Sequence, residues 1–284
     1  MSEILTVTDL KKVYGKGGSL TRALDGVSLS LEAGEFVGVM GPSGSGKTTL
    51  LNCVSTIDRP SAGSIVIDGR ELTRLKGKEL AKFRRERLGF IFQDCNLLDT
   101  LTTYENIALS LSIIRAPAQK IDRRVREMAE FLGITDCLNK YPYQMSGGQQ
   151  QRCAAARAMV THPALVLADE PTGALDSKSS QMLLDRLDAL NRDLGTTILM
   201  VTHDAFTASC CRRVVFLRDG KLFLELHRGR TAGKRSSKRS SRWSPRWEEG
   251  WLMFSKLALR NVRRSFRDYG VYLLTLTFGV GLFY

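Results

Sequence analysis

No two of the six cysteines form a C-x-x-C pair, and histidine is scarce, so the spacing of a zinc site is missing. The cysteines are Cys53, Cys95, Cys137, Cys153, Cys210 and Cys211, and the histidines are His162, His203 and His227. The adjacent cysteines at 210 and 211 have poor geometry for a mutual disulfide. We therefore expect reduced thiols, as in the cytosol. Residues 1–10 have no basic stretch followed by an apolar run, so we expect no signal peptide.

A strong basic excess is also missing from most of the chain. The 284 residues carry 42 Lys and Arg against 29 Asp and Glu, a net charge of +13 that would suit a nucleic-acid partner. However, residues 228–284 hold 13 of these basic residues and three of the acidic ones, so they carry +10 and residues 1–227 carry +3. Residues 1–227 therefore lack the basic surface of a nucleic-acid-binding protein, and we expect no nucleic acid among the partners.

Strand-like and helix-like segments alternate through residues 1–227, which we predict to form one domain. Runs typical of strands lie at 5–10, 23–31, 36–40, 65–67, 164–168, 197–202 and 214–224. The run Phe36–Met40 is continuously apolar, as in a buried parallel strand. A helical stretch at 179–194 separates two further apolar runs, and this alternation predicts a parallel α/β sheet. The dipeptide Asp219-Gly220 predicts a hairpin turn.

The stretch from about Asp94 to Val160 is helical in character, and we predict a helical subdomain over residues 94–160. Within it, Val125, Met128 and Leu132 fall on one face of a helix, and Gly133 is placed to end that helix.

A P-loop motif directly follows the apolar run at 36–40. The stretch Gly41-Pro42-Ser43-Gly44-Ser45-Gly46-Lys47-Thr48 fits G-x-x-x-x-G-K-[ST], and residues 49–54 can continue as a helix. Its glycines let backbone N–H groups surround phosphates, and the helix N-terminus adds positive potential. We expect Lys47 to reach the β- and γ-phosphates and Thr48 to ligate Mg²⁺. The sequence therefore predicts a nucleoside triphosphate site.

Two carboxylates end the apolar run at 165–168. Asp169 is placed to hold Mg²⁺ directly or through water, and Glu170 to polarise an attacking water. Taken alone, such a pair is about as often a simple strand end at the surface. The preceding P-loop favours the catalytic interpretation.

Further motifs follow in the order of the ATP-binding subunits of ABC transporters, and the chain resembles that family. The stretch from Ser146 to Arg152 matches the family signature, with Met145 where leucine is usual. Gln93 matches the Q-loop, residues 173–176 the D-loop, and His203 the switch histidine. Tyr14 matches the aromatic residue that stacks on adenine.

The resemblance implies roles for individual residues. Those implied to bind ATP are Tyr14, Gly41, Ser43, Gly44, Ser45, Gly46, Lys47, Thr48, Thr49, Gln93, Ser146, Gly147, Gly148 and Asp176. Those implied to hold Mg²⁺ are Thr48, Gln93 and Asp169. Those implied to be catalytic are Lys47, Gln93, Glu170 and His203.

The resemblance also implies an architecture and partners. The expected fold is a P-loop NTPase with a parallel core sheet, an antiparallel β subdomain and a helical subdomain that carries the signature. Two copies would bind two ATP molecules head to tail, because the signature of one closes on the nucleotide of the other. Closure on ATP and opening after hydrolysis would drive an integral-membrane permease. This implies a place on the cytoplasmic face of the bacterial cell membrane.

Residues 88–102 resemble the Q-loop of bacitracin-resistance exporters, with Cys95 where Tyr is more usual. This resemblance implies an ATPase that powers export of antimicrobial peptides. Leu97, Leu98 and Leu101 are candidate contacts for the permease, although ordinary core packing explains them equally well. The ATPase of a lipoprotein-releasing, macrolide-export or cell-division complex is the alternative. A DNA-associated ABC ATPase is disfavoured, because the 53 positions between Gln93 and Ser146 leave no room for a coiled coil.

The texture changes after His227. Residues 228–246 contain eight basic and no acidic residues, and we predict a disordered basic linker over 228–252. Residues 253–284 resemble the start of an FtsX-like permease, with four arginines before the apolar run at 269–284. Such arginines suit the cytoplasmic side and anionic lipid. The run has sixteen residues, an incomplete transmembrane segment, since a span needs about 20.

Our hypothesis for this end of the chain is a frame change that fused two neighbouring reading frames. The codons of Trp247-Glu248-Glu249-Gly250 can contain a purine-rich ribosome-binding sequence shortly before the Met253 codon. The alternatives are a genuine fusion to a permease and a basic amphipathic tail that rests on the membrane.

Overall fold

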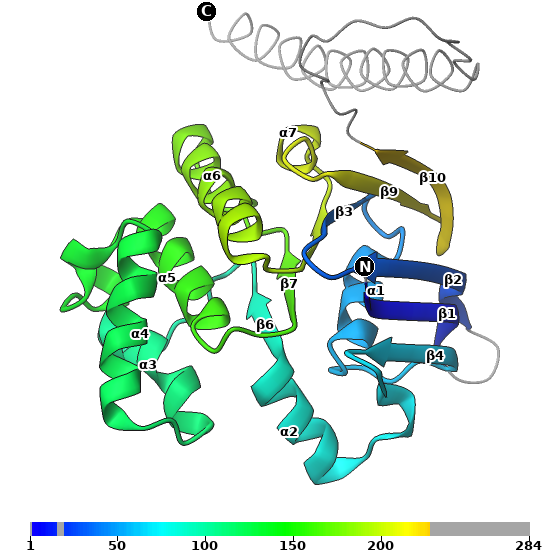
Figure 1. Cartoon of the computed structure of the whole chain (residues 1–284). Coiled ribbons are helices and arrows are strands. Elements are labelled where there is room, and N and C mark those ends of the chain that lie inside the picture. The colour runs from blue at the N-terminus through cyan, green and yellow to red at the C-terminus, as the bar shows by residue number, and fades with distance from the viewer. Residues whose placement is uncertain (1, 16–19, 228–284) are drawn as a thin grey trace, which may run out of the picture. The chain divides into compact units, whose positions relative to one another are not determined.

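The computed structural model describes residues 2–15 and 20–227, with a six-stranded sheet in the order β10-β9-β3-β8-β7-β6 (Figure 1). Its strands are β3 (Phe36–Met40), β6 (Leu88–Ile91), β7 (Leu165–Asp169), β8 (Ile198–Thr202), β9 (Arg213–Arg218) and β10 (Lys221–His227). Five of these strands are parallel, which confirms the predicted core sheet. The sixth, β10, is antiparallel to β9, so the sheet is mixed. The predicted turn explains this, since Asp219 and Gly220 both have positive φ, 50° and 74°.

The predicted antiparallel β subdomain is confirmed as a four-stranded sheet in the order β2-β1-β4-β5. Its strands are β1 (Glu3–Tyr14), β2 (Thr21–Glu32), β4 (Ala62–Ile67) and β5 (Arg70–Glu71). Leu5 and Val7 are buried and alternate with more exposed residues along β1, as the period of a half-buried strand requires.

Seven α-helices lie in the part of the chain that the structure describes. They are α1 (Lys47–Val54), α2 (Gly77–Arg87), α3 (Thr103–Ile113), α4 (Ala118–Phe131), α5 (Gly147–Met159), α6 (Ser177–Leu194) and α7 (Ala205–Ala208). The predicted face of α4 is confirmed, because Val125 and Met128 are buried with the following Leu132. Gly133 follows with φ +64° and ends the helix as expected.

The sequence pattern predicted no helix between residues 54 and 90, but the structure has α2 there. This helix is dominated by charged residues, and Phe83 is its single buried side chain. A helix with so few apolar positions has no stripe of period 3.6 that a sequence pattern can reveal.

Two apolar cores cover the two faces of the central sheet. Leu165 and Leu167 of β7 pack with α1 and the antiparallel sheet. Val166 and Ala168 of the same strand pack with α6 and the helices α3 to α5. Because successive side chains of a strand point to opposite faces, β7 is apolar throughout until Asp169 leaves the core at its carboxyl end.

The predicted linker at 228–252 and the predicted permease start at 253–284 lie outside the described residues. Over residues 2–15 and 20–227, the structure contains no helix with the length and apolarity needed to cross a membrane.

We expect Leu187→Ala in α6 to lower the free energy of unfolding by about 2–5 kcal/mol, because a buried leucine leaves a cavity. Leu187 is fully buried, whereas Leu194 in the same helix is 49% exposed and supplies the matched control, Leu194→Ala. Urea unfolding of both variants checks this. Equal losses in the two variants would contradict the assigned packing.

Candidate nucleotide site

The P-loop passes between two backbone segments that leave no room for a side chain. A Cβ atom on Gly41 would lie 2.1 Å from the carbonyl oxygen of Leu217 in β9. A Cβ atom on Gly46 would lie 2.3 Å from the carbonyl oxygen of Ala23 in β2. Gly46 also has φ +100° and precedes the first residue of α1. Glycine is therefore required at both positions by close approach, and at Gly46 by backbone conformation as well.

Lys47 folds back over this loop. Its Nζ donates to the carbonyl oxygens of Gly41 (2.8 Å) and Pro42 (2.9 Å), which leaves one of its three protons for a further acceptor. Burial lowers the pKa of Lys47, although the carboxylates of Glu170 and Asp169 oppose the shift. The ammonium thus sits in a poorly solvated position where an anion would be a favourable partner.

Ser45 supplies a second group suited to a phosphate. Its side chain is 3% exposed, and its hydroxyl has no hydrogen-bond partner. A buried hydroxyl without a partner is unfavourable by about 1–3 kcal/mol. An incoming phosphate oxygen would relieve this.

Thr48 and Asp169 face each other across the end of β7, with 3.5 Å between Thr48 Oγ1 and Asp169 Oδ1. Burial, and then the neighbouring Glu170, raise the pKa of Asp169 above its usual value of 3.8. Both donor atoms are hard oxygens, which fit Mg²⁺. Among the described residues no group of three or more His, Cys, Asp or Glu is placed to hold a metal.

Glu170 and His203 meet at the adjacent carboxyl ends of β7 and β8. The distance from Glu170 Oε2 to His203 Nδ1 is 2.8 Å, and the amide of Glu170 donates to the carbonyl of Val201. Glu170 has φ +44°, a left-handed conformation that turns its side chain out of the strand direction. The structure thus brings together two residues that are 33 positions apart in the sequence.

Gln93 follows β6 and is exposed. A Cβ atom on Gly173 would lie 3.2 Å from Gln93 Cδ, so the amide packs against the loop that follows Glu170. Over the described ranges, no hydrogen bond joins Gln93 to Thr48 or Asp169.

Tyr14 is anchored by residues that the sequence analysis missed. Its hydroxyl donates to Asp58 Oδ2 (2.7 Å), and Lys12 Nζ bonds Asp58 Oδ1 (2.6 Å). The Lys12 ammonium also lies 4.8 Å from the centroid of the Tyr14 ring. Tyr14 remains 40% exposed, so much of its ring is accessible. Because Asp58 is 44 positions away in the loop after α1, no local pattern could have revealed it.

The signature and the D-loop each begin a helix. Ser146 caps α5, because its hydroxyl accepts from the amide of Gln149 and the side chain of Gln149 accepts in return from the amide of Ser146. Asp176 caps α6 by accepting from the amide (2.9 Å) and the hydroxyl (2.7 Å) of Ser179. In the described part of the chain, no hydrogen bond joins the P-loop to Ser146, Gly147 or Gly148.

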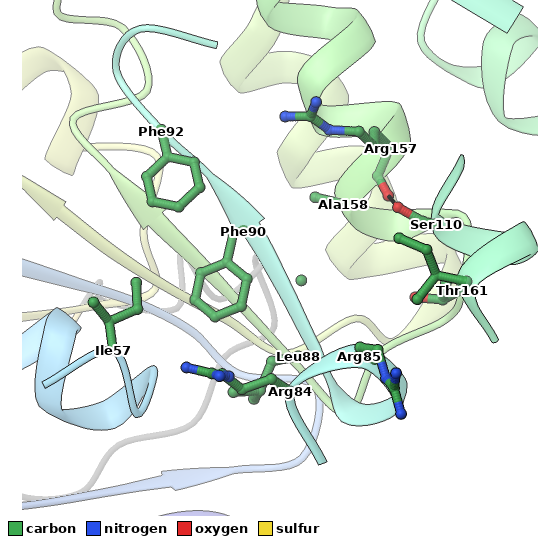
Figure 2. A pocket seen from close by; sticks show the side chains of 12 residues that line it. Ile57, Arg84, Arg85, Leu88, Phe90, Phe92, Ser110, Arg157, Ala158 and Thr161 are labelled. Carbon is green, nitrogen blue, oxygen red and sulfur yellow. Dashed lines mark hydrogen bonds between the residues drawn. The ribbon is translucent and has the colours of Figure 1, made fainter. Parts of the chain in front are cut away.

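A groove of about 390 Å³ lies apart from these groups, next to β6 (Figure 2). Phe90 and Phe92 stack with ring centroids 5.8 Å apart, and three guanidinium groups, of Arg84, Arg85 and Arg157, also line it. Arg157 donates to the carbonyl oxygens of Cys95 (2.9 Å) and Asn96 (2.7 Å), which ties the segment after Gln93 to α5.

The leucines expected at the permease contact differ in burial. Leu97 packs against the core around α3 to α5, which matches the alternative interpretation. Leu98 is 46% exposed and stays a candidate contact.

A P-loop between a buried strand and a helix, with two carboxylates at the end of a nearby parallel strand, defines a P-loop nucleotide-binding cassette. A profile of the ABC transporter family matches residues 24–173, and the chain belongs to that family. It is the ATP-binding and ATP-hydrolysing subunit of an ABC transporter.

Known proteins are similar to this chain over most of its length. The chain is 54% identical to the bacitracin export ATP-binding protein BceA of Halalkalibacterium halodurans, over 80% of this chain and 89% of that protein. It is 53% identical to the ABC transporter ATP-binding protein YxdL of Bacillus subtilis, over 81% and 90%. A solved dimer of the ATP-binding cassette MJ0796 with ADP and Pi has a TM-score of 0.73 at 39% identity, and the match covers 79% of this chain and 99% of that one.

We expect Asp169→Asn to raise the free energy of unfolding of the nucleotide-free protein in EDTA at pH 7.5. Folded Asp169 binds its proton more tightly than the unfolded chain does, so its ionisation destabilises the folded state at neutral pH. This destabilisation is absent below the unfolded pKa and present above the folded one. The gain should therefore shrink as the pH falls towards 3.8. Urea unfolding at several pH values checks this, and a variant less stable at pH 7.5 would contradict it.

Proposed function

We propose that the chain powers an exporter that removes antimicrobial peptides of the bacitracin class, together with an FtsX-like permease. The observation that carries this is the 54% identity to a bacitracin export ATP-binding protein over 80% of the chain. The match covers 89% of that relative, so it extends over nearly the whole of the related subunit.

In this proposal the P-loop residues bind the phosphates of ATP and Tyr14 stacks on adenine. Phosphate binding is supported by the hydroxyl of Ser45, which has no hydrogen-bond partner, and by the one N–H of Lys47 that donates to no protein carbonyl. The accessible ring of Tyr14 supports stacking, with Asp58 holding its orientation. The remaining phosphate-binding residues, Gly41, Ser43, Gly44, Gly46, Thr48 and Thr49, lie on the same loop or in the first turn of α1.

Glu170 accepts the proton of the attacking water, and His203 holds the carboxylate in place through its 2.8 Å contact. Thr48 and Asp169 would hold Mg²⁺, and Gln93 would be a further ligand. Bound there, Mg²⁺ would neutralise part of the phosphate charge.

We infer that the working form is a head-to-tail dimer. The signature residues Ser146 to Gly148 begin a helix whose amides favour an anion. They make no hydrogen bond to the P-loop among the described residues, so a partner copy would supply the nucleotide that they meet. Asp176, which caps α6, would lie at the same interface.

The permease binds the groove beside β6. Its aromatic floor and three guanidinium groups suit an amphipathic helix with at least one carboxylate. This contact would place the subunit on the cytoplasmic face of the membrane.

Residues 1–227 are the ATPase domain, with a helical subdomain at about 94–160. We propose that residues 228–252 are a linker and that residues 253–284, which resemble the start of a permease, are that segment.

We expect Glu170→Gln to bind ATP but to hydrolyse it at least about 100-fold more slowly, because a general base is removed. The closed dimer should then accumulate with ATP, which size-exclusion chromatography detects. Lys47→Ala is the control, and it should lose ATP affinity and form no such dimer. Hydrolysis by Glu170→Gln at the wild-type rate would exclude Glu170 as the base.

We expect deletion of the gene to sensitise the host to bacitracin and leave its sensitivity to macrolides unchanged. Growth inhibition by both classes of drug measures this, and complementation with Glu170→Gln should fail to restore resistance. Sensitivity to macrolides alone would favour the macrolide-export alternative and contradict the proposed substrate class.

A further inference from the structure

A chain of hydrogen bonds centred on the buried Thr207 links the segment after Glu170 to the segment after His203. The hydroxyl of Thr207 lies 2.8 Å from that of Thr172 and 2.7 Å from Asp204 Oδ2. Thr207 is fully buried, whereas Thr172 is half-buried and Asp204 is exposed. Thr172 stands two positions after Glu170, and Asp204 directly follows His203.

The direction of each hydrogen bond follows from the number of protons. Asp204 caps α7 and accepts from the amides of Phe206 and Thr207 and from the Thr207 hydroxyl. Burial acts to raise the pKa of Asp204, but these hydrogen bonds outweigh it and lower the pKa, so the carboxyl is ionised at neutral pH and accepts. Thr207 thus donates its single proton to Asp204. The proton between the two threonines therefore comes from Thr172.

Two contacts therefore join the two segments, one near the surface and one deeper in the protein. The outer contact is the one between Glu170 and His203, whose side chains are 22% and 59% exposed. The inner contact is the one between Thr172 and Thr207. Glu170, His203 and Thr172 border a cleft of about 560 Å³, whereas Thr207 lies buried behind it. Because water competes for the outer contact, that contact alone would leave the His203 side chain free to turn away.

We propose that Thr207 and Thr172 are positioning residues for ATP hydrolysis, whose hydroxyl bond holds His203 within reach of Glu170. This inference rests on the proposed roles of Glu170 and His203. The bond holds together the segment that follows Glu170 and the segment that follows His203, which keeps the carboxylate and the imidazole close to each other.

The test compares steady-state ATP hydrolysis of the full-length wild-type chain and Thr207→Val, a change that keeps the volume and removes the hydroxyl. We expect kcat to fall about tenfold while KM for ATP stays within about twofold, because the P-loop is untouched. Thr207→Ser restores the hydroxyl and should recover most of kcat. Ser209→Ala is the matched control, since it removes a hydroxyl that bonds Phe206 in the same short helix and leaves Thr172 alone.

A double-mutant cycle with Thr172→Val completes the test. Both hydroxyls belong to one bond, so the double variant should be no slower than the slower single variant. Losses that multiply, or a wild-type kcat in Thr207→Val, would overturn the proposal. An equal loss in Ser209→Ala would also overturn it, because α7 as a whole would then be responsible. If a thermal melt shows that Thr207→Val does not fold, Thr172→Val replaces it in the test, with the same criteria for kcat and KM, because Thr172 is only half-buried.

Failure of the inference is distinguishable from failure of the proposed site. An inactive Glu170→Gln with an active Thr207→Val rejects the positioning role alone. An active Glu170→Gln rejects the catalytic assignment itself.

Discussion

The close passage of the P-loop between β2 and β9 is the constraint on which the rest of the site depends. Gly41 and Gly46 bring the loop against the carbonyls of Leu217 and Ala23, where a Cβ atom would meet oxygen at 2.1 and 2.3 Å. The amide of Gly220 also bonds the carbonyl of Ser45. The antiparallel sheet, the central sheet and the loop are thereby held together, and α1 starts at a defined point.

Several polar and charged groups around this loop are in unfavourable environments when no nucleotide is bound. Lys47 is held where burial lowers its pKa, and Asp169 where burial and Glu170 raise its pKa. The hydroxyl of Ser45 has no partner. Each of these unfavourable features would be relieved by a phosphate with a cation, so the site is organised for its ligand before the ligand arrives.

Local motifs predicted much of this site. The P-loop, the carboxylates Asp169 and Glu170, and His203 could be found because each directly follows a recognisable apolar strand. Parallel strands end at one edge of a sheet, which brings such residues together. The helix α2 escaped prediction because it is dominated by charged residues and buries only Phe83. The anchor of Tyr14 at Asp58 escaped because the pair is 44 positions apart.

The sequence by itself determined the cassette architecture and its phosphate chemistry, because glycine spacing, apolar periodicity and the order of the motifs are local properties. Only the tertiary structure decided which side chains support them. The bonds from Tyr14 at the end of β1 to Asp58, and from Thr172 to Thr207 in α7, join residues that are far apart in the sequence. The groove beside β6 likewise combines residues from separate elements. Such contacts depend on how strands and helices pack, and no short stretch of sequence encodes them.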